Sequence, residues 1–288
     1  MRPSVPSSFG APFGPVLRRA AFAALSAAVA VAFVLPSPAA AQVAPYNEDG
    51  MTFGHVHLNV SDLEAHKALW VEQFGGEVVE KGPLTAIKWP DLILILSERE
   101  PTAGSMATVM DHFGFKVRDI EPFLASWREA GLEVQAEFTG AEGFPNAYLM
   151  APDSVRLELQ EDPELPNPVE GYHVHWFTPE YQEVLDWYVD VFGAERFQRG
   201  SIETTANVPG QNLSFGNSEE PQLPSRGTAI DHIGFEFRDL EAFVEELRAK
   251  GIELDVPVRE IPSIGLKIAF LTDPSGVYVE LTEGLDEY

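Results

Sequence analysis

The sequence predicts an α+β fold made of four copies of one βαβββ unit. Two observations carry this prediction: the chain repeats itself, and each repeat passes from the two-residue period of a strand to the spacing of a helix. "GHVHLNVSDLEAHKALWVEQFGG" from Gly54 matches "YHVHWFTPEYQEVLDWYVDVFGA" from Tyr172, and "DHFGFKVRDIEPFLASWREAGLEV" from Asp111 matches "DHIGFEFRDLEAFVEELRAKGIEL" from Asp231. Corresponding points lie 118 to 122 residues apart, so the order of the units is A, B, A′, B′.

The first 41 residues have the organisation of a secretory signal peptide. Arg18 and Arg19 precede an apolar run from Ala20 to Leu35, and small residues lead to a cleavage site predicted after Ala41. The run is shorter than the roughly 20 residues that a transmembrane helix needs. We therefore expect a periplasmic or secreted protein, with Sec and twin-arginine export both open.

Composition limits the partners and the chemistry. Without residues 1–41, 16 basic and 45 acidic residues leave a net charge of −29, which repels nucleic acid and anionic lipid headgroups. The chain has no cysteine, which excludes disulfides, thiolate metal sites and a cysteine nucleophile. Any metal must therefore bind through histidine and carboxylate side chains.

The first unit shows how each element is predicted. "HVHLNV" alternates like a strand with one buried face, the apolar side chains being Val56, Leu58 and Val60. A helix follows Asp62 and ends at Gly75-Gly76, with an apolar stripe of Leu63, Trp70, Val71 and Phe74. Short apolar strands such as "DLILILSE" complete the unit.

The mature chain divides into two predicted domains of two units each. "EDPELPNPVEG", rich in proline and acid, is predicted to be the linker over 161–171. The first domain then covers 42–160 and the second 172–288. The sequence does not indicate the oligomeric state.

Six of the seven histidines fall in first strands, on the face opposite the helix and so on the concave side of the sheet. One position recurs as histidine in all four units, seven residues before the closing acid, at His55, His112, His173 and His232. The last strands of the B units add Glu158 and Glu280 to the same face, and polar neighbours predict polar cups. We predict one metal site in each domain, formed by His55, His112 and Glu158 and by His173, His232 and Glu280. Such ligands suit Fe(II), Mn(II), Zn(II) or Co(II).

This pattern resembles the vicinal oxygen chelate superfamily, which includes glyoxalase I, fosfomycin-modifying enzymes and type I extradiol dioxygenases. The resemblance covers Phe53 to Glu283 and rests on the H-x-x-x-x-x-x-D first strands and on "TDPSGVYVEL", although Ser154 replaces the usual glycine in "APDSVRLEL". It implies that the βαβββ units pair into two cup-like, partly open mixed β-barrels. It also implies that the same six residues hold a divalent metal that chelates adjacent oxygens of a small-molecule substrate.

The remaining groups bear on the reaction. The second histidine of each His-Val-His, His57 and His175, lies on the same face and is a candidate proton-transfer group; it could instead order water or substrate, or support the glutamate ligand. Lys116, Arg156 and Lys267 could attract an anionic substrate. Extradiol dioxygenases typically add a histidine upstream of the closing strand, and this chain has none there in either half. They also add a tyrosine just before the closing strand, where the first half of this chain has Tyr148 and the second half has Phe270.

Three functions remain open at this point. The favoured one is an exported metal-dependent lyase or isomerase of the glyoxalase type. The second is an Fe(II) dioxygenase, and the third is a binding protein without catalysis. Neither the substrate, the metal nor the number of active cups can be predicted.

Overall fold

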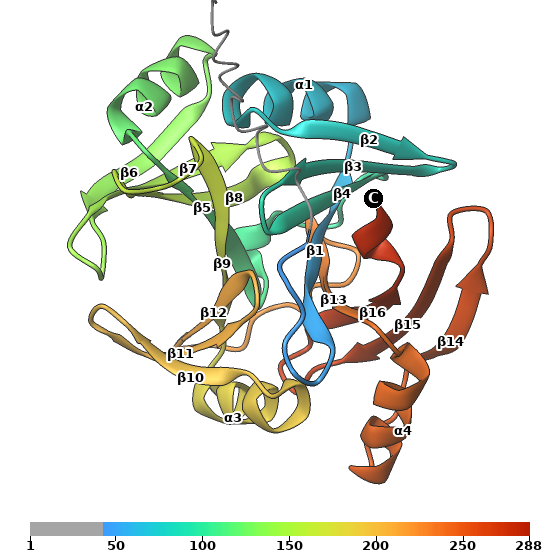
Figure 1. Ribbon diagram of the computed structural model, residues 1–288. Coiled ribbons are helices and arrows are strands. Elements are labelled where there is room, and N and C mark those ends of the chain that lie inside the picture. Colours follow the sequence, from blue (N-terminus) through green and yellow to red (C-terminus); the bar gives the residue numbers. More distant parts are fainter. Residues whose placement is uncertain (1–42) are drawn as a thin grey trace, which may run out of the picture. The chain divides into compact units, whose positions relative to one another are not determined.

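The computed structural model describes residues 43–288, so the predicted signal peptide lies outside the described residues. These residues form four βαβββ modules in chain order, as predicted (Figure 1). The elements of module 1 are β1 (Met51–Val60), α1 (Leu63–Phe74), β2 (Glu77–Lys81), β3 (Leu84–Trp89) and β4 (Leu92–Glu98). Those of module 2 are η1 (Ser105–Ala107), β5 (Met110–Val117), α2 (Ile120–Glu129), β6 (Glu133–Thr139), β7 (Pro145–Ala151), η2 (Pro152–Ser154) and β8 (Val155–Glu161).

The second half of the chain repeats this order. The elements of module 3 are β9 (Val169–Phe177), α3 (Tyr181–Phe192), β10 (Glu195–Arg199), β11 (Ile202–Val208) and β12 (Gln211–Gly216). Those of module 4 are β13 (Ile230–Phe237), α4 (Leu240–Ala249), β14 (Val256–Ile261), β15 (Leu266–Thr272), β16 (Tyr278–Glu283) and η3 (Leu285–Glu287). Strand β9 already starts at Val169, so the connection between the halves is shorter than the predicted linker. Within residues 43–288, none of the helices is both long and apolar enough to cross a bilayer.

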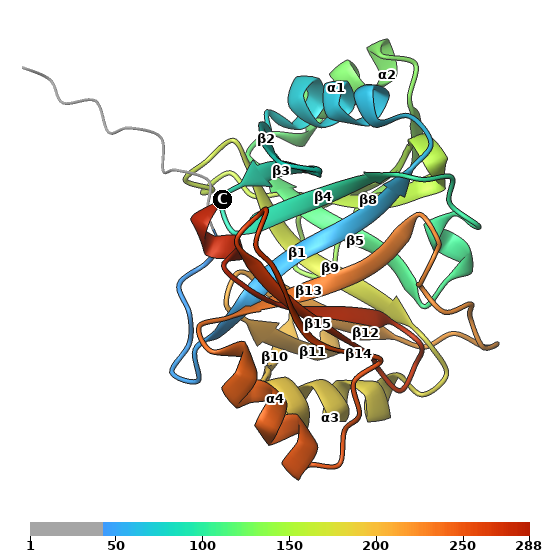
Figure 2. The ribbon, with the colours of Figure 1, turned by 90° about the vertical axis from the view of Figure 1, so that its right-hand side faces the viewer.

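The modules pair into two eight-stranded mixed sheets, which confirms the α+β fold class. The strand orders are β14-β15-β16-β13-β1-β4-β3-β2 and β10-β11-β12-β9-β5-β8-β7-β6. Each sheet curves into an open cup, which we name the β1/β13 cup and the β5/β9 cup after the two first strands that meet at its centre. Figure 2 shows β1 and β13 side by side in the first of these sheets.

Each cup is built across the two halves of the chain, and the predicted pairing within each half is wrong. Module 1 pairs with module 4 and module 2 with module 3. The halves 42–160 and 172–288 are therefore sequence repeats, but neither forms a cup by itself. The physical reason is that β5 and β13 carry the same pattern of histidine, glycine and apolar residues, so that either strand could pair with the edge of β1.

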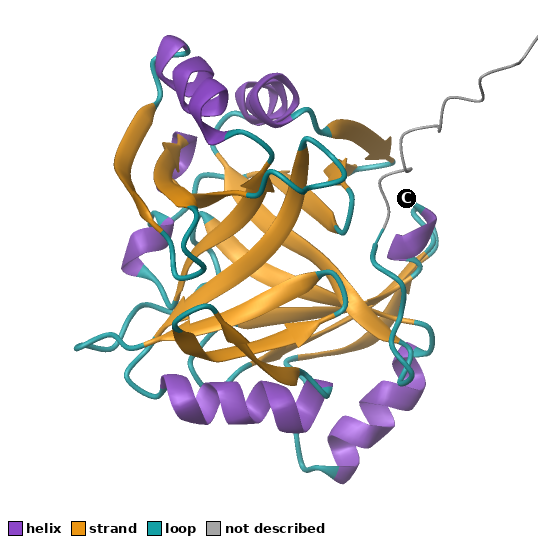
Figure 3. Ribbon diagram, turned by 60° about the vertical axis from the view of Figure 1, so that its left-hand side comes forward, coloured by secondary structure: helices purple, strands orange, loops and turns teal. Residues whose placement is uncertain are grey.

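Packing of the helices holds the modules of one half together. Helices α1 and α2 cover one side of the strands and α3 and α4 the opposite side (Figure 1), so that Figure 3 shows a pair of helices on either side of the sheets. In the first half the ring of Phe74 in α1 lies 4.6 Å from Phe115 of β5, and in the second half Phe192 of α3 lies 4.3 Å from Phe235 of β13. These aromatic contacts join the two sheets through one continuous apolar core.

The local predictions for module 1 mostly agree with the structure. Helix α1 begins at the cap Asp62, whose side chain accepts the Ala65 amide, and ends at Gly75 in the left-handed conformation, with φ of 65°. Residues Val56, Leu58 and Val60 are fully buried beneath the helices. Val71 is an exception, since it is 39% exposed and does not belong to the buried stripe.

Candidate metal sites

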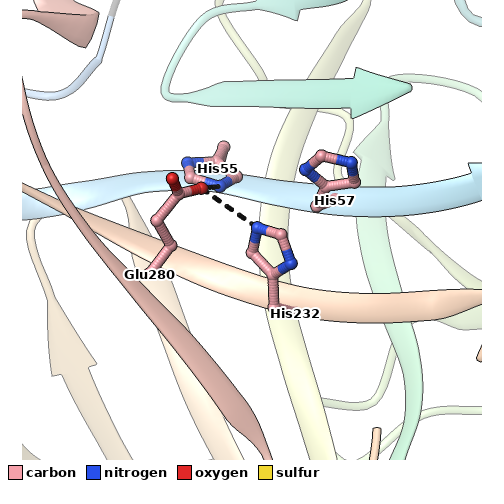
Figure 4. Close-up of side chains that lie close together, drawn as sticks. All are labelled: His55, His57, His232 and Glu280. Atoms are coloured by element: carbon pink, nitrogen blue, oxygen red, sulfur yellow. Dashed lines mark hydrogen bonds and ion pairs between the residues drawn. The ribbon is translucent and has the colours of Figure 1, made fainter. Parts of the chain in front are cut away.

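The histidines and glutamates of the first strands and last strands gather into two clusters. In the β1/β13 cup, Nε2 of His55 and Nε2 of His232 each lie 3.0 Å from the same oxygen, Oε2 of Glu280. Figure 4 shows these side chains converging, with His57 beside them on β1. The ligand atoms of all four residues lie within 4.8 Å of one another.

The β5/β9 cup holds the matching cluster. Nε2 of His112 lies 3.1 Å and Nε2 of His173 lies 3.4 Å from Oε2 of Glu158. His175 completes a group of four whose ligand atoms again lie within 4.8 Å of one another. All four side chains are buried.

All six predicted ligands therefore lie in the two clusters, but the predicted grouping is wrong. His112 joins His173 instead of His55, and His232 joins His55 instead of His173. Each glutamate stays with the histidine of its own module. The error follows directly from the pairing of the modules across the two halves.

Strand register explains how three adjacent strands build each cluster. Across β1, β13 and β16, one row consists of His55, Gly234 and Glu280, and the next row of His57, His232 and Tyr278. Across β9, β5 and β8, the corresponding rows are His173, Gly114 and Glu158, then His175, His112 and Arg156. The first histidine of each His-Val-His thus reaches its glutamate across a glycine.

That glycine makes room for the histidine ring, a role that the sequence alone did not reveal. A Cβ atom at Gly234 would lie 2.1 Å from Cε1 of His55, and one at Gly114 would lie 2.3 Å from Cε1 of His173. Any larger residue would displace the ring. The sequence pattern that could have indicated this role is His-x-Gly-Phe, which occurs in both B units.

Acidic and amide side chains orient the ligands from outside the clusters. Asp111 Oδ1 lies 2.6 Å from Nδ1 of His112, and Asp231 Oδ1 lies 2.5 Å from Nδ1 of His232, which turns the opposite nitrogen toward the glutamate. Nδ2 of Asn146 donates to Oε1 of Glu158 at 2.6 Å. The prediction from the sequence missed these two aspartates, although the dipeptide Asp-His begins both B units and could have indicated their role.

The electrostatics leave most of the imidazoles neutral near pH 7. Burial lowers the pKa of His55, and lowers the pKa values of His57 and His175 well below their usual range. Burial, followed by the positive charge of Arg199, lowers the pKa of His173 to about 4. Neutral imidazoles are the form that binds a metal or accepts a proton.

His232 and Glu280 form an ion pair. Burial opposes both charges, but the bonds to Asp231 and Glu280 outweigh it and raise the pKa of His232 to about 9. Likewise, the close approach of His232 and His55 outweighs the effect of burial and holds the pKa of Glu280 well below its usual value. A metal bound here would displace the proton between them.

The residues of both clusters fit a divalent metal. Metal bonds of roughly 2.0–2.2 Å from nitrogen and oxygen place neighbouring ligand atoms about 3 Å apart, and the His55, His232 and Glu280 atoms have this spacing. Both ring nitrogens of His55 and of His173 are buried and lack a hydrogen-bond partner among residues 43–288, although each Nε2 points at a glutamate oxygen. A cation between each Nε2 and its glutamate oxygen would satisfy that nitrogen.

The second histidines lie at the edge of the clusters. Nε2 of His57 lies 2.7 Å from Oγ of Ser97, and the ring of His175 stacks on Phe177 at 4.5 Å. Among the hydrogen bonds of residues 43–288, neither histidine is bonded to the glutamate of its cluster. The structure therefore does not support the predicted alternative in which the second histidine supports the glutamate ligand. Both can serve as a fourth ligand or as a proton acceptor.

The two cups differ in what covers their clusters. The β1/β13 cup is lined by apolar residues, contrary to the prediction that both cups are polar: Ala86, Ile93, Ile95, Ile268 and Phe270. Leu285, fully buried, and Tyr288 pack against this lining, and Tyr288 donates its hydroxyl to the Ile264 carbonyl at 2.7 Å. Figure 1 shows η3 between strands β2–β4 and strands β14–β16. The last residues of the chain thus fill this cup.

The β5/β9 cup carries polar residues at the equivalent register positions: Thr205, Asn212, Ser214, Asn146 and Tyr148. Lys116, Tyr172, Phe197 and Asn212 line part of a cavity of about 410 Å³ in this cup. A small molecule can therefore enter this cup from solvent.

The three cations predicted to attract an anion are already paired. Lys116 lies 3.0 Å from Asp162, Arg156 lies 2.9 Å from Asp111, and Lys267 lies 2.8 Å from Glu241. The prediction missed Arg199, which is 3% exposed and forms no ion pair with any carboxylate of residues 43–288.

Comparison with known proteins agrees with this fold. The model of the "Glyoxalase/Bleomycin resistance protein/Dioxygenase superfamily" matches residues 52–159 and again 171–281. The chain belongs to this superfamily. It is a tandem member, because each half matches the model separately. The superfamily resemblance drawn from the sequence is thereby confirmed.

Some similar proteins match about one half of this chain, and others match most of it. The uncharacterized protein YwkD of Bacillus subtilis (strain 168) is 28% identical over 122 residues, which are 39% of this chain and 94% of that protein. The crystal structure of glyoxalase I from Zea mays has a TM-score of 0.66 at 17% identity, covering 82% of this chain and 94% of that one. A putative dioxygenase from Bacillus subtilis subsp. subtilis str. 168 has a TM-score of 0.64 at 12% identity, covering 83% and 86%. At these identities the structures share the fold alone.

Proposed function

We propose that this protein is a divalent-metal-dependent enzyme of the glyoxalase-like lyase or isomerase type that acts on a small molecule with adjacent oxygens. The observation that carries the proposal is the convergence of two imidazole nitrogens on one carboxylate oxygen in a buried site, in the same cup as a cavity of about 410 Å³. A bound metal would polarise the substrate oxygens and stabilise the negative charge that develops on them. Fe, Mn, Zn and Co all suit these ligands.

The β5/β9 cup is the active one in this proposal. It holds His112, His173 and Glu158 together with a cavity of about 410 Å³, whereas Leu285 and Tyr288 fill the other cup. The cluster at His55, His232 and Glu280 then holds a structural metal. Duplication would thus have left one catalytic site and one closed site.

His175 is the proposed proton acceptor of the active cup. Its buried, neutral imidazole lies beside His112, with ring centroids 4.8 Å apart, and its Nδ1 has no hydrogen-bond partner in residues 43–288. A neutral imidazole at this place can take a proton from the carbon next to a polarised carbonyl. His57 is its counterpart in the closed cup.

Metal content is the first measurement. Mass spectrometry on untagged protein should find two metals per chain, with one lost in His112→Ala and the other in His232→Ala. Deuterium exchange into an α-hydroxy ketone such as hydroxyacetone, followed by NMR in D₂O, should be abolished by His112→Ala and by His175→Gln but should persist in His232→Ala. No bound metal after reconstitution would leave a non-catalytic binding protein.

An Fe(II) dioxygenase is the second candidate, favoured by one residue. Tyr148 lies in the β5/β9 cup with its ring 5.4 Å from His112, where the closed cup has Phe270. Burial raises the pKa of Tyr148 to about 12, so its hydroxyl stays protonated and can donate a hydrogen bond. Oxygen consumption with a catechol, dependent on Fe(II) and lost in Tyr148→Phe, would favour this function over the first.

Export is also proposed, on the residues of the N-terminal segment alone. The basic pair, the apolar run and the small residues before Gln42 are typical of a cleavable signal peptide. Cell fractionation and N-terminal sequencing of the mature protein test this. An intact N-terminus in the cytoplasmic fraction would contradict it.

A further inference from the structure

The buried guanidinium of Arg199 stands out in the β5/β9 cup. The residue is 3% exposed, its Nε is buried without a hydrogen-bond partner, and no carboxylate of residues 43–288 forms an ion pair with it. Burying an uncompensated charge is strongly unfavourable. An anion that binds from outside the chain would compensate the buried positive charge of such a side chain.

The position of Arg199 connects it to the metal site. Its carbon Cζ lies 5.3 Å from the ring centroid of Tyr172, and that ring lies 5.2 Å from the ring of His173. The guanidinium and the cluster are thus separated by the width of one aromatic side chain. Tyr172, whose ring lies between the two groups, also lines the cavity of this cup.

The carboxylate of Glu142, which contacts Tyr172, is already satisfied. Oε2 of Glu142 accepts hydrogen bonds from the hydroxyl of Tyr172 and from Nε2 of Gln160, the latter at 2.7 Å. Glu142 therefore holds Tyr172 in place instead of neutralising Arg199. The surface of the protein is strongly acidic, with a formal charge of −26, so a local cation is needed to admit an anion.

The closed cup has a cation at the equivalent position. Strand register places Lys81 of β2 where β10 has Arg199, since each pairs with the first residue of the following strand. Nζ of Lys81 lies 4.0 Å from the ring centroid of Tyr288, and Nζ of the neighbouring Lys88 donates to the main-chain oxygen of Tyr288. In the β1/β13 cup the ring beside this cation thus belongs to Tyr288, which follows β16, whereas in the β5/β9 cup it belongs to Tyr172 of β9.

We infer that Arg199 is a specificity-determining residue that binds a carboxylate at the end of the substrate remote from the chelated oxygens. The inference rests on the proposed function, because it takes the metal cluster as the other anchor. The substrate class is then a small anion with adjacent oxygens at one end and a carboxylate at the other. Arg199 binds and orients this substrate, while the cluster and His175 carry the chemistry.

Two matched probes test the inference on zinc-loaded protein by calorimetry. Both 2-oxoglutarate and 2-oxopentanoate carry a chelating 2-oxo acid, but only the first has a remote carboxylate. Wild type should bind 2-oxoglutarate at least tenfold more tightly, as expected of a charge-assisted pair. Arg199→Met and Arg199→Gln should abolish the preference, whereas Arg199→Lys should keep part of it. Zinc content and the melting temperature verify that each variant is folded.

Two cationic residues elsewhere are the controls. Lys81→Met changes the equivalent position of the closed cup, and Lys267→Met removes a half-buried charge that is paired with Glu241 and Glu283. Both should retain the wild-type preference. An equal affinity of wild type for the two probes, an unchanged preference in Arg199→Met and Arg199→Gln, or failure of zinc-loaded wild type to bind either probe would overturn the inference. Loss of the proposed function would show separately, as a protein that takes up no metal.

Discussion

Two adjacent rows of side chains form each cluster, and the glycine in the first row is as informative as the ligands. Gly234 lies between His55 and Glu280, and Gly114 lies between His173 and Glu158. A side chain at either glycine would occupy the space in which the histidine ring lies. The ligand geometry thus depends on a residue that offers no ligand atom.

Gly234→Ala should remove the metal of the β1/β13 cup. The added Cβ would lie 2.1 Å from Cε1 of His55, so the ring must leave its position, and overpacking of this kind destabilises a protein by roughly 1–3 kcal/mol. We expect the metal content to fall from two per chain to one, measured by mass spectrometry, together with a lower melting temperature.

Gly114→Ala is the matched variant. It should remove the other metal and also the activity of the β5/β9 cup, because its Cβ would lie 2.3 Å from Cε1 of His173. Retention of two metals by both variants would show that the ligand geometry does not depend on these glycines.

At the scale of elements, the segment that follows β16 decides the difference between the cups. Glu236 of β13 accepts the backbone N–H groups of Gly284 and Leu285 at 2.7 and 2.9 Å, and Leu285 packs into the apolar lining. The same carboxylate also contacts Thr282 and lies 3.4 Å from the hydroxyl of Tyr46. One buried glutamate therefore anchors the segment that closes the cup.

Glu236 should make the stability of the protein depend on pH. Burial, with a smaller contribution from the charge of Asp286, raises its pKa from 4.5 to about 7, against the hydrogen bonds that it accepts. Because the folded-state pKa is the higher one, the stabilisation is fully present below pH 4.5 and is lost as the pH rises through about 7. The loss amounts to roughly 3 kcal/mol.

Urea unfolding at pH 5 and pH 8 measures this effect. Wild type should lose free energy of unfolding between the two pH values relative to Glu236→Gln, which has no proton to release at this position. Parallel pH profiles for the two proteins would contradict the assignment to Glu236.

At the scale of the whole molecule, each half of the chain supplies one module to each cup. Helix packing within a half, such as Phe74 on Phe115, joins the two sheets, while strand pairing joins the two halves. A separated half would expose one edge of each of its two first strands. Exposed strand edges tend to pair with strands of another chain. The metal clusters therefore need both halves.

Residues 42–160 expressed alone should form a dimer. Strand β1 of one copy would find β5 of the other, since β5 and β13 share their pattern, and the exchange restores two cups. Light scattering after gel filtration should give twice the mass of the fragment. The metal site would then combine His55 of one copy with His112 and Glu158 of the other. A stable folded monomer would contradict this view of the assembly.

The sequence by itself determined the four βαβββ modules, the buried and concave faces of their strands, the six ligand candidates and the superfamily. These follow from local periodicity and from repeated motifs, which involve residues close together along the chain. The tertiary structure decided which modules pair, because two first strands with the same pattern compete for one edge and the sequence does not distinguish them. It also decided that Leu285 and Tyr288 fill one cup and that, among the described residues, no carboxylate forms an ion pair with Arg199 in the other. Both outcomes depend on the positions of residues far apart in the chain.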